Sequence, residues 1–427
     1  MTSPRHGSET TARIARRKPP ALYGPRLENN PAQVYHDMRE EYGPVAPVLL
    51  EGDVPAWLVL GYREAQYVTG NPHLFGRRHS WHLASEDWSL RPYGVAASSS
   101  THSEGDQYRQ KSAAVHDAIT AITVITAIAA IDQFELRAHV ERIADSLIDS
   151  FAGRGKADLI AQYTHRIPLL VLAKLFGLPD TEAPDLVRDL AISAAEGPEA
   201  VRANERIMSR TQRLVAEKKE RPGPDMSSRM PAHPEVPSDE TVATDLCITM
   251  SAAQRATSDW MGNALRLMLV DERFAVSLSG GRRSVGQTLN EVLWEETPVQ
   301  NFVGRWATQD TQLAGRRIQA GDMLVLGLAA ANTDPLVRPV SSPDTADTAA
   351  GSAGNQAYMS FSHGEHGCPR PAQDVAATIA QGGIEVLLDR LPDVDLAVPP
   401  EALVWRPSMW TRGLTSLPVE FTPVYVT

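Results

Sequence analysis

The amino-acid sequence predicts a mainly α-helical protein with minor β structure, an α+β fold. Long stretches with apolar residues at three- and four-residue spacing predict amphipathic helices, and short apolar runs bounded by Gly and Pro predict a few strands. The longest helical pattern covers residues 241–269 without a proline, and at about 1.5 Å per residue such a helix can cross a whole domain. No repeat is present, and we expect a disordered tail over residues 1–20 and a single domain over residues 21–427.

Composition excludes several classes of protein. With 42% hydrophobic and 22% charged residues, the 427-residue chain is neither disordered nor fibrous. A net charge of −11 argues against nucleic-acid binding, which favours a basic face. The two cysteines, Cys247 and Cys368, exclude a disulfide scaffold and fit a reducing compartment. The longest uncharged apolar stretch, residues 118–131, is shorter than the ~20 residues of a membrane span, so we expect a soluble, cytoplasmic protein.

Turn residues and periodicity predict the elements of the N-terminal half. After a turn at residues 42–44, the runs VAPVLL and WLVLG are split by Gly and Pro, which predicts a β-hairpin. A helix is expected from Gln133 to a stop at Gly153, because one face carries Phe134, Leu136, Val140, Ile143, Leu147, Ile148 and Phe151. The run HRIPLLVLAKLFGLP predicts a second, apolar helix, and residues 196–220 predict a long exposed one.

The C-terminal half begins with residues 221–237, which contain five prolines and are expected to form a loop. Ser238, followed by two acids, has the composition of a helix start. The long central helix should be followed by a short helix around Glu291, a small sheet within residues 303–332, a loop over residues 341–356, a helix after Cys368 and short closing strands.

The stretch FSHGEHGC, residues 361–368, is the most informative part of the sequence. Gly364 and Gly367 permit a tight loop, and Cys368 precedes a helix whose free N–H groups and dipole favour a thiolate. Three interpretations follow from the residues alone. Cys368 can be an inert cysteine in a turn, a zinc ligand with His363 and His366, or a nucleophile paired with His366. A zinc site here would lack a fourth ligand nearby, and a catalytic Cys368–His366 pair would lack a third group that orients the histidine.

A fourth interpretation comes from resemblance. The stretch resembles the haem-binding loop of cytochrome P450, Phe-Gly-x-Gly-x-His-x-Cys-x-Gly, with Ser362 and Arg370 standing where the family has Gly. The resemblance implies haem b (iron protoporphyrin IX) as cofactor, with these roles: Cys368 as axial iron ligand, His366 at a propionate, Phe361 beneath the haem, and Gly364 in the loop.

Other segments extend the resemblance from about residue 20 to the C-terminus. The runs YGPV…WLVLGYREA, TSDWMGNALRLML and LAGRRIQAGDMLVLGLAAANTDP resemble the family's N-terminal sheet, its central helix and the segment before the Cys loop, and Arg305 corresponds to a propionate-binding arginine. The resemblance implies a helix-rich prism with small N- and C-terminal sheets. It also implies a monooxygenase that oxidises a small organic substrate with O2 and electrons from a ferredoxin-type donor.

The Glu-x-x-Arg motif of the family is altered. The segment here is Glu291-Val292-Leu293-Trp294, and no Lys or Arg occurs between Arg338 and Arg370. Two basic groups that secure the Cys loop in the family are therefore absent. We expect the loop to be secured by packing of Trp294 or by its indole N–H. In this respect the chain resembles the bacterial subgroup that carries Trp at this position.

The central helix also departs from the family. Ala253, Arg255 and Ala256 replace a Gly, an acid and a Thr that face the iron in oxygen-activating members. Methyl groups and an arginine do not deliver protons near neutral pH. Thr257 lies about 100° further around the helix, and Gln254 can order a water but has no labile proton.

The predicted catalytic positions are Ala253, Gln254, Ala256 and Thr257, and the replacements at positions 253, 255 and 256 leave two alternatives open. One is a haem-binding homologue with impaired O2 activation that uses peroxide, rearranges a substrate, senses a ligand or binds a partner. The other is a fold retained without haem as a binding module.

Two further departures concern the haem itself. Tyr108 and Ser112 stand at positions where the family has a propionate-binding His and Arg. Arg109 or Lys111 can compensate, but we expect both to lie on a solvated face and the haem affinity to be lower than is usual in the family. Pro369 and Pro371 lack an N–H, so fewer backbone donors reach the Cys368 sulfur. We expect this to lower the reduction potential of the iron, with the charge of Arg370 as a partial offset.

Overall fold

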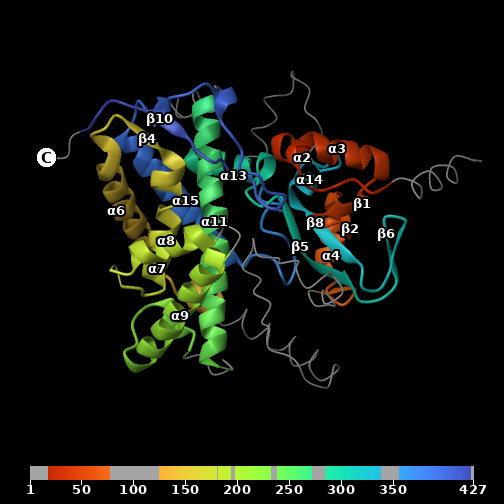
Figure 1. Cartoon of the computed structure of the whole chain (residues 1–427), viewed down its shortest axis with the longest axis horizontal. Coiled ribbons are helices and arrows are strands. Elements are labelled where there is room, and N and C mark those ends of the chain that lie inside the picture. Colours follow the sequence, from red (N-terminus) through yellow and green to blue (C-terminus); the bar gives the residue numbers. More distant parts are fainter. Residues whose placement is uncertain are drawn as a thin grey trace, which may run out of the picture.

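The computed structural model describes residues 18–76, 125–179, 181–193, 198–231, 238–271, 284–337 and 355–424. The sequence predictions for residues 1–17, for the positions 108–112 and for most of the loop 341–356 lie outside these ranges. Within them, a helical half and a sheet half lie side by side, and helix α11 runs through the helical half from end to end (Figure 1).

Helices form most of the described chain. They are α2 (Pro25–Asn29), α3 (Pro31–Tyr42), α4 (Tyr62–Gly70), α6 (Gln133–Ala152), α7 (Ile167–Leu175), α8 (Ala183–Ser193), α9 (Pro198–Glu220), α10 (Met226–Arg229), α11 (Asp239–Val270), α13 (Val285–Glu295), α14 (Leu328–Asn332) and α15 (Arg370–Arg390). A π-helix, η3 (Ile160–Thr164), precedes α7, and a 3-10 turn, η5 (Pro400–Ala402), lies near the C-terminus. The predicted mainly helical α+β class is confirmed.

The main sheet has five strands in the order β1-β2-β8-β5-β3. The strands are β1 (Val45–Leu50), β2 (Val54–Val59), β8 (Met323–Gly327), β5 (Asn301–Ala307) and β3 (Phe75–Gly76). Strands β1 and β2 form the predicted hairpin, and β2 pairs with β8 in parallel. Two segments far apart in the sequence therefore share one sheet, which joins the N-terminal hairpin to the segment before the Cys loop.

Two small sheets complete the β structure. One has the order β4-β10-β9, formed by β4 (Lys156–Asp158), β10 (Pro418–Glu420) and β9 (Asp395–Leu396). The other is a hairpin of β6 (Thr311–Leu313) and β7 (Arg316–Ile318). The short strands predicted at the C-terminus are confirmed.

Capping side chains set where the helices begin. The Ser238 side chain accepts a hydrogen bond from the backbone N–H of Thr241, as predicted for the start of α11. Ser284 and Gln287 form a capping box at α13, which satisfies two backbone donors at once. Residues 221–237 are not wholly a loop, because α10 forms within them with Asp225 as its N-cap.

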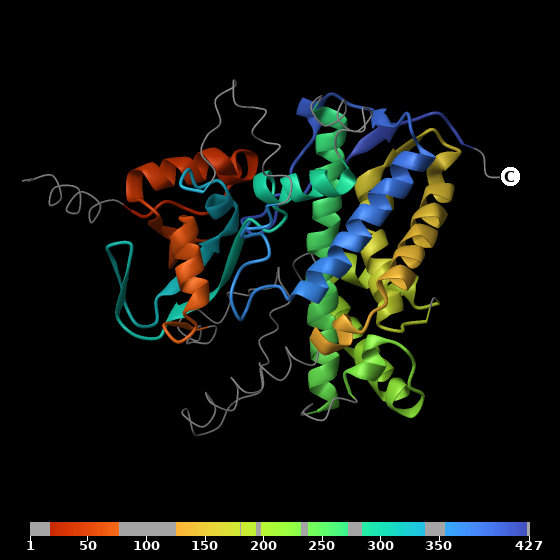
Figure 2. The same cartoon turned by 180° about the vertical axis from the view of Figure 1, so that it is seen from behind.

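The helical half has its core between α6, α11 and α15. Helix α15 lies beside α6 and against α11 (Figure 2). The predicted face of α6 is buried at Leu136, Val140 and Phe151, but Phe134 is 88% exposed, so its assignment to that face is wrong. Phe134 stands in the first turn, where Asp132 caps the helix and the chain has not yet reached the core.

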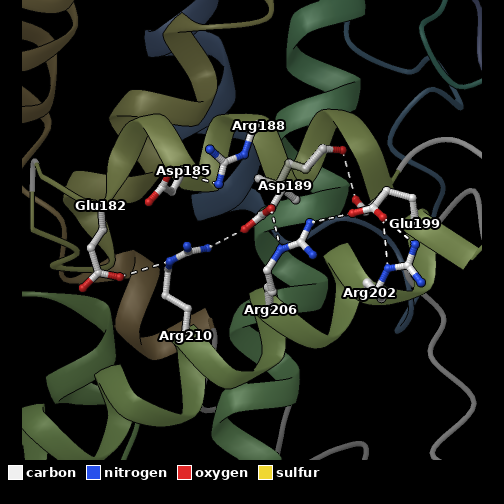
Figure 3. A network of polar contacts seen from close by, with 10 residues as sticks. Glu182, Asp185, Arg188, Asp189, Glu199, Arg202, Arg206 and Arg210 are labelled. Carbon is white, nitrogen blue, oxygen red and sulfur yellow. Dashed lines mark hydrogen bonds and ion pairs between the residues drawn. The ribbon is translucent and has the colours of Figure 1, made fainter.

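Helices α8 and α9 are joined by an ion-pair network (Figure 3). The fully buried carboxylate of Asp189 accepts from Arg206 at 2.9 Å and from Arg210 at 3.3 Å. Glu182 and Glu199 extend the network at its two ends. A buried carboxylate needs such partners, and this one holds the two helices together.

Among the described helices, none combines the length and apolar character that a membrane span requires.

Candidate active site on the cysteine loop

Glycine geometry shapes the loop of residues 355–368, which we call the Cys loop. Gly364 has φ +76°, and a Cβ there would lie 2.4 Å from the carbonyl oxygen of Thr69 at the end of α4. At Gly367 a Cβ would lie 3.2–3.3 Å from the backbone of Gly364 and His363. The loop is thus packed too closely for a side chain at Gly364 and tightly at Gly367, in agreement with the tight turn predicted from the sequence.

Ser362 carries strain at the position where the family pattern has Gly. Its φ is 59°, in the left-handed region that disfavours side chains. Its hydroxyl oxygen is buried and makes no hydrogen bond to the described residues. The departure from the family pattern therefore has a local cost in the backbone and in the side chain.

The Cys368 thiol is half-buried at the end of the loop. The Cys368 N–H donates to the carbonyl of Phe361 at 2.8 Å, which closes the loop. The one hydrogen bond that Sγ makes to the described residues is a long one, 4.0 Å, to the carbonyl oxygen of Pro369. Burial raises the pKa of the thiol to about 12. In the polypeptide alone, burial therefore favours the neutral thiol of Cys368 over the thiolate that the helix start predicts.

The side chain of Arg370 is largely exposed, donates to Gln356 at 2.9 Å and pairs with Asp374 at 3.0 Å. The partial offset expected from its charge at the sulfur stays a prediction. Among the described residues, no three His, Cys, Asp or Glu side chains form a metal-binding cluster, which leaves the zinc alternative without support.

The centre of α11 lies opposite the Cys loop. The rings of Trp260 in α11 and Phe361 in the loop are 5.9 Å apart, edge to face. Ala253 and Ala256 lie within about 40° of Trp260 around the helix, so they share its face. Both alanines are partly buried, whereas the helix is fully buried from Thr257 through Leu265. A partly exposed apolar strip thus lies on the helix face that the Cys loop contacts.

Other predicted positions on α11 turn away from that face. Gln254 donates to the carbonyl of His165 and to the hydroxyl of Ser258, both at 3.2 Å. This places its amide towards η3, about 120° around the helix from Trp260. Thr257 is buried, 3% exposed, about 60° from Trp260. His165, whose carbonyl accepts from Gln254, is itself largely buried, and this burial lowers the pKa of its imidazole to about 4.

Arg305 lies in β5 and is 1% exposed. Its Nη1 donates to the carbonyl of Gly304 at 3.1 Å. His366 is half-buried in the Cys loop, two residues before Cys368. A guanidinium removed from water is stabilised by an anionic group, so Arg305 suits a carboxylate ligand.

Comparison with known proteins agrees with this arrangement. No protein-family model matches the chain. Cytochrome P450-SU2 of Streptomyces griseolus is 29% identical over 405 residues, which are 94% of this chain and 96% of that protein. The polyketide biosynthesis cytochrome P450 PksS of Bacillus subtilis is 26% identical over 317 residues, 72% and 74% of the two chains.

Solved structures show the same fold. The structure of PksS superposes with a TM-score of 0.75 at 22% identity, over 94% of this chain and 99% of that one. P450BioI, solved in complex with hexadec-9Z-enoic acid ligated acyl carrier protein, has a TM-score of 0.73 at 22% identity, over 93% and 99%. The chain is a cytochrome P450 homologue. Its cofactor is haem b, and its class is that of the monooxygenase oxidoreductases.

The described residues of this P450 homologue fit a haem. A flat apolar group needs accessible apolar surface on one side and a metal ligand on the other. The strip at Ala253 and Ala256 and the Cys368 thiol, all partly exposed, provide these on two elements that the Trp260–Phe361 contact brings together. A thiol that coordinates a metal is deprotonated, so iron would overcome the high pKa of Cys368.

Sequence reasoning missed several residues that organise this region. Trp260 was detectable, because it lies four residues after Ala256 on the same helical face. Tyr358, Ser360 and Asn332 gave no signal, since they match no motif and their roles depend on contacts between distant segments. The expected role of Trp294 was stated only as packing or hydrogen bonding, and the structure shows both.

Proposed function

We propose that this P450 homologue oxidises a small, largely apolar organic substrate at a haem ligated by Cys368, with electrons from a ferredoxin-type donor. One observation carries the proposal. The Cys368 loop is docked through Phe361 onto the α11 face whose centre, at Ala253 and Ala256, is apolar and partly exposed. An apolar surface beside the reaction site favours an apolar substrate.

Each predicted cofactor-binding residue has a role in this proposal. Cys368 would ligate the iron, and Phe361 would pack beneath the haem beside the sulfur. Arg305 and His366 would bind the propionates, and Gly364 permits the close approach of the loop to α4. Since the described contacts bring no N–H donor to Sγ, the thiolate would remain strongly electron-donating.

The haem, when bound, supplies the activation of O2 and the transfer of one oxygen atom. The chain must bind the substrate against α11, exclude water and supply protons. Ala253 and Ala256 can do the first two, because they are apolar and adjacent. Neither can supply a proton, and Gln254 is turned towards η3. Proton supply is therefore the weakest part of this site.

Isotope labelling tests the proposal. The holoenzyme, with a surrogate ferredoxin, its reductase and NADPH, is incubated under ¹⁸O2 with two probes, hexadec-9-enoic acid and a macrolactone. These probes are chosen because P450BioI and PksS are associated with an acyl chain and with polyketides. We expect one ¹⁸O atom in the product of at least one probe. Products that carry oxygen from water only would overturn the proposal.

The apolar centre of α11 favours a second candidate, a peroxide-driven oxidation. Peroxide brings its own protons and electrons, so it does not require the acid and hydroxyl that Arg255 and Ala256 replace. In the same assay without NADPH, added H2¹⁸O2 should then give labelled product faster than ¹⁸O2 with NADPH does. Product formation that requires NADPH and is not supported by added peroxide would exclude this candidate.

A further inference from the structure

A tryptophan of α13 holds the beginning of the Cys loop. The indole N–H of Trp294 donates to the carbonyl of Asn355 at 3.1 Å. Its ring meets that of Tyr358 edge to face, with centroids 5.8 Å apart. Trp294 itself is buried, whereas Asn355 is exposed and Tyr358 is partly buried. A hydrogen bond and an aromatic contact thus join α13 to the loop at two successive points.

An asparagine at the end of α14 holds the middle of the loop. Asn332 donates through Nδ2 to the carbonyl of Leu293 at 2.8 Å and to the Ser360 hydroxyl at 2.9 Å, and its Oδ1 accepts from the N–H of Met359 at 2.6 Å. Ser360 in turn donates to the carbonyl of Leu293 at 2.5 Å. Both polar side chains are buried, and their bonds link α13, α14 and the loop in one network.

Aromatic contacts extend this network to the cysteine. Tyr358 contacts Phe361, with ring centroids 6.0 Å apart, and Phe361 contacts Trp260 of α11. The carbonyl of Phe361 then accepts the N–H of Cys368. The position of Cys368 relative to α11 therefore depends on a continuous series of contacts that begins at α13.

We propose that Trp294, Asn332 and Ser360 form a neutral clamp that positions the Cys loop for haem ligation. These are positioning residues, since none of them contacts the sulfur. The inference rests on the proposed haem-thiolate function. The named contacts of the clamp involve only uncharged groups, so salt should not weaken them, whereas ion pairs at the surface are screened. The clamp accounts for a secured loop in a chain where Trp replaces the arginine of the family motif.

Three variants of the full chain test the clamp. Asn332→Ala removes the bonds to Leu293, Met359 and Ser360, and Trp294→Phe keeps the ring but removes the indole donor. Asn263→Ala is the matched control, because Asn263 is also fully buried and donates to two carbonyls, those of Glu296 and Arg412, without contacting the Cys loop. All three should lower the thermal midpoint, but only the first two alter the loop.

The first readout uses the haem-free chain. Amide hydrogen exchange in the Cys loop should be at least tenfold faster in Asn332→Ala and about threefold faster in Trp294→Phe than in the wild type, because opening of the loop becomes more frequent. Asn263→Ala should leave exchange in the loop unchanged. Equal exchange in Asn332→Ala and Asn263→Ala would overturn the clamp, whether or not the chain binds haem.

The second readout uses the haem-loaded protein. In the reduced, CO-bound state, thiolate ligation gives a long-wavelength Soret band, and loss of the thiolate gives a shorter-wavelength one. We expect the short-to-long ratio to rise at least threefold in Asn332→Ala, and the wild-type ratio to stay constant from low to molar salt. A ratio unaffected by the variant, or a wild-type ratio that rises with salt, would overturn the clamp. A wild type without the long-wavelength band would instead overturn the proposed function.

Discussion

The Cys loop and the centre of α11 face each other, yet they differ in how completely they are equipped. The loop is fixed at its start, middle and end by Trp294, Asn332 and the Cys368–Phe361 hydrogen bond. The α11 centre presents only methyl groups at Ala253 and Ala256. The difference indicates that holding the cofactor and supplying protons are separate tasks in this fold, and that this chain is equipped mainly for the first.

The largest expected effect comes from restoring proton donors on α11. Ala256→Thr together with Arg255→Asp should improve coupling, measured as product formed per NADPH consumed, on the order of tenfold, because a positioned acid and hydroxyl contribute at least that much to proton transfer. Ala256→Val with Arg255→Asp is the control, since Val matches the shape of Thr without its hydroxyl. Equal coupling in the two double variants would show that the methyl groups are not the limitation.

The pH dependence of stability tests the side of α11 that faces η3, where the His165 imidazole is largely buried. The folded-state pKa of His165 is lowered from 6.5 to about 4, chiefly by burial, with Asp259 opposing and Arg255 adding to the shift. Below pH 6.5 the unfolded chain therefore binds a proton that the folded chain does not. Stability should be full above pH 6.5 and fall by up to about 3 kcal/mol as the pH approaches 4.

Chemical denaturation at several pH values measures this effect. His165→Gln should flatten the fall in unfolding free energy between pH 6.5 and 4.5, and His36→Gln, which removes an exposed imidazole on α3, should not. Identical slopes for the wild type and His165→Gln would contradict the assignment of a buried neutral imidazole at this position.

The smallest effect concerns the strained serine of the Cys loop. Ser362→Gly should stabilise the fold by about 1 kcal/mol, because glycine adopts a positive φ without penalty and no buried hydroxyl remains unbonded. Thermal unfolding of the haem-free chain measures the shift. Ser362→Ala removes the hydroxyl but keeps the strained backbone, so its gain should be smaller. A Gly variant no more stable than the Ala variant would place the cost in the hydroxyl alone.

Much of the fold could be predicted from the sequence, since its signals are local. The cap at Ser238 and the proline-free run behind it gave α11, and the paired apolar runs gave the β1–β2 hairpin. Phe134 was misplaced because periodicity alone cannot show that the first turn of α6 extends beyond the core. Helix α10 was missed since flanking prolines concealed a single capped turn.

The candidate site was predictable only where a motif carries it. Cys368, Gly364 and Arg305 could be proposed from the family pattern. Asn332 could not, because it lies 28 residues before Ser360 and becomes a clamp only when α14 packs beside α13. The high pKa of the Cys368 thiol was also inaccessible, since it arises from burial by segments far away in the sequence.

The spectrum of the reduced, CO-bound protein tests the central claim most directly. Wild-type protein expressed with ample porphyrin precursor should show the long-wavelength Soret band of thiolate ligation. Cys368→Ser should lose the band, and Cys247→Ser should keep it, because Cys247 lies on α11 in contact with Thr211, outside the Cys loop. A colourless wild type, or a band that survives Cys368→Ser, would contradict the account.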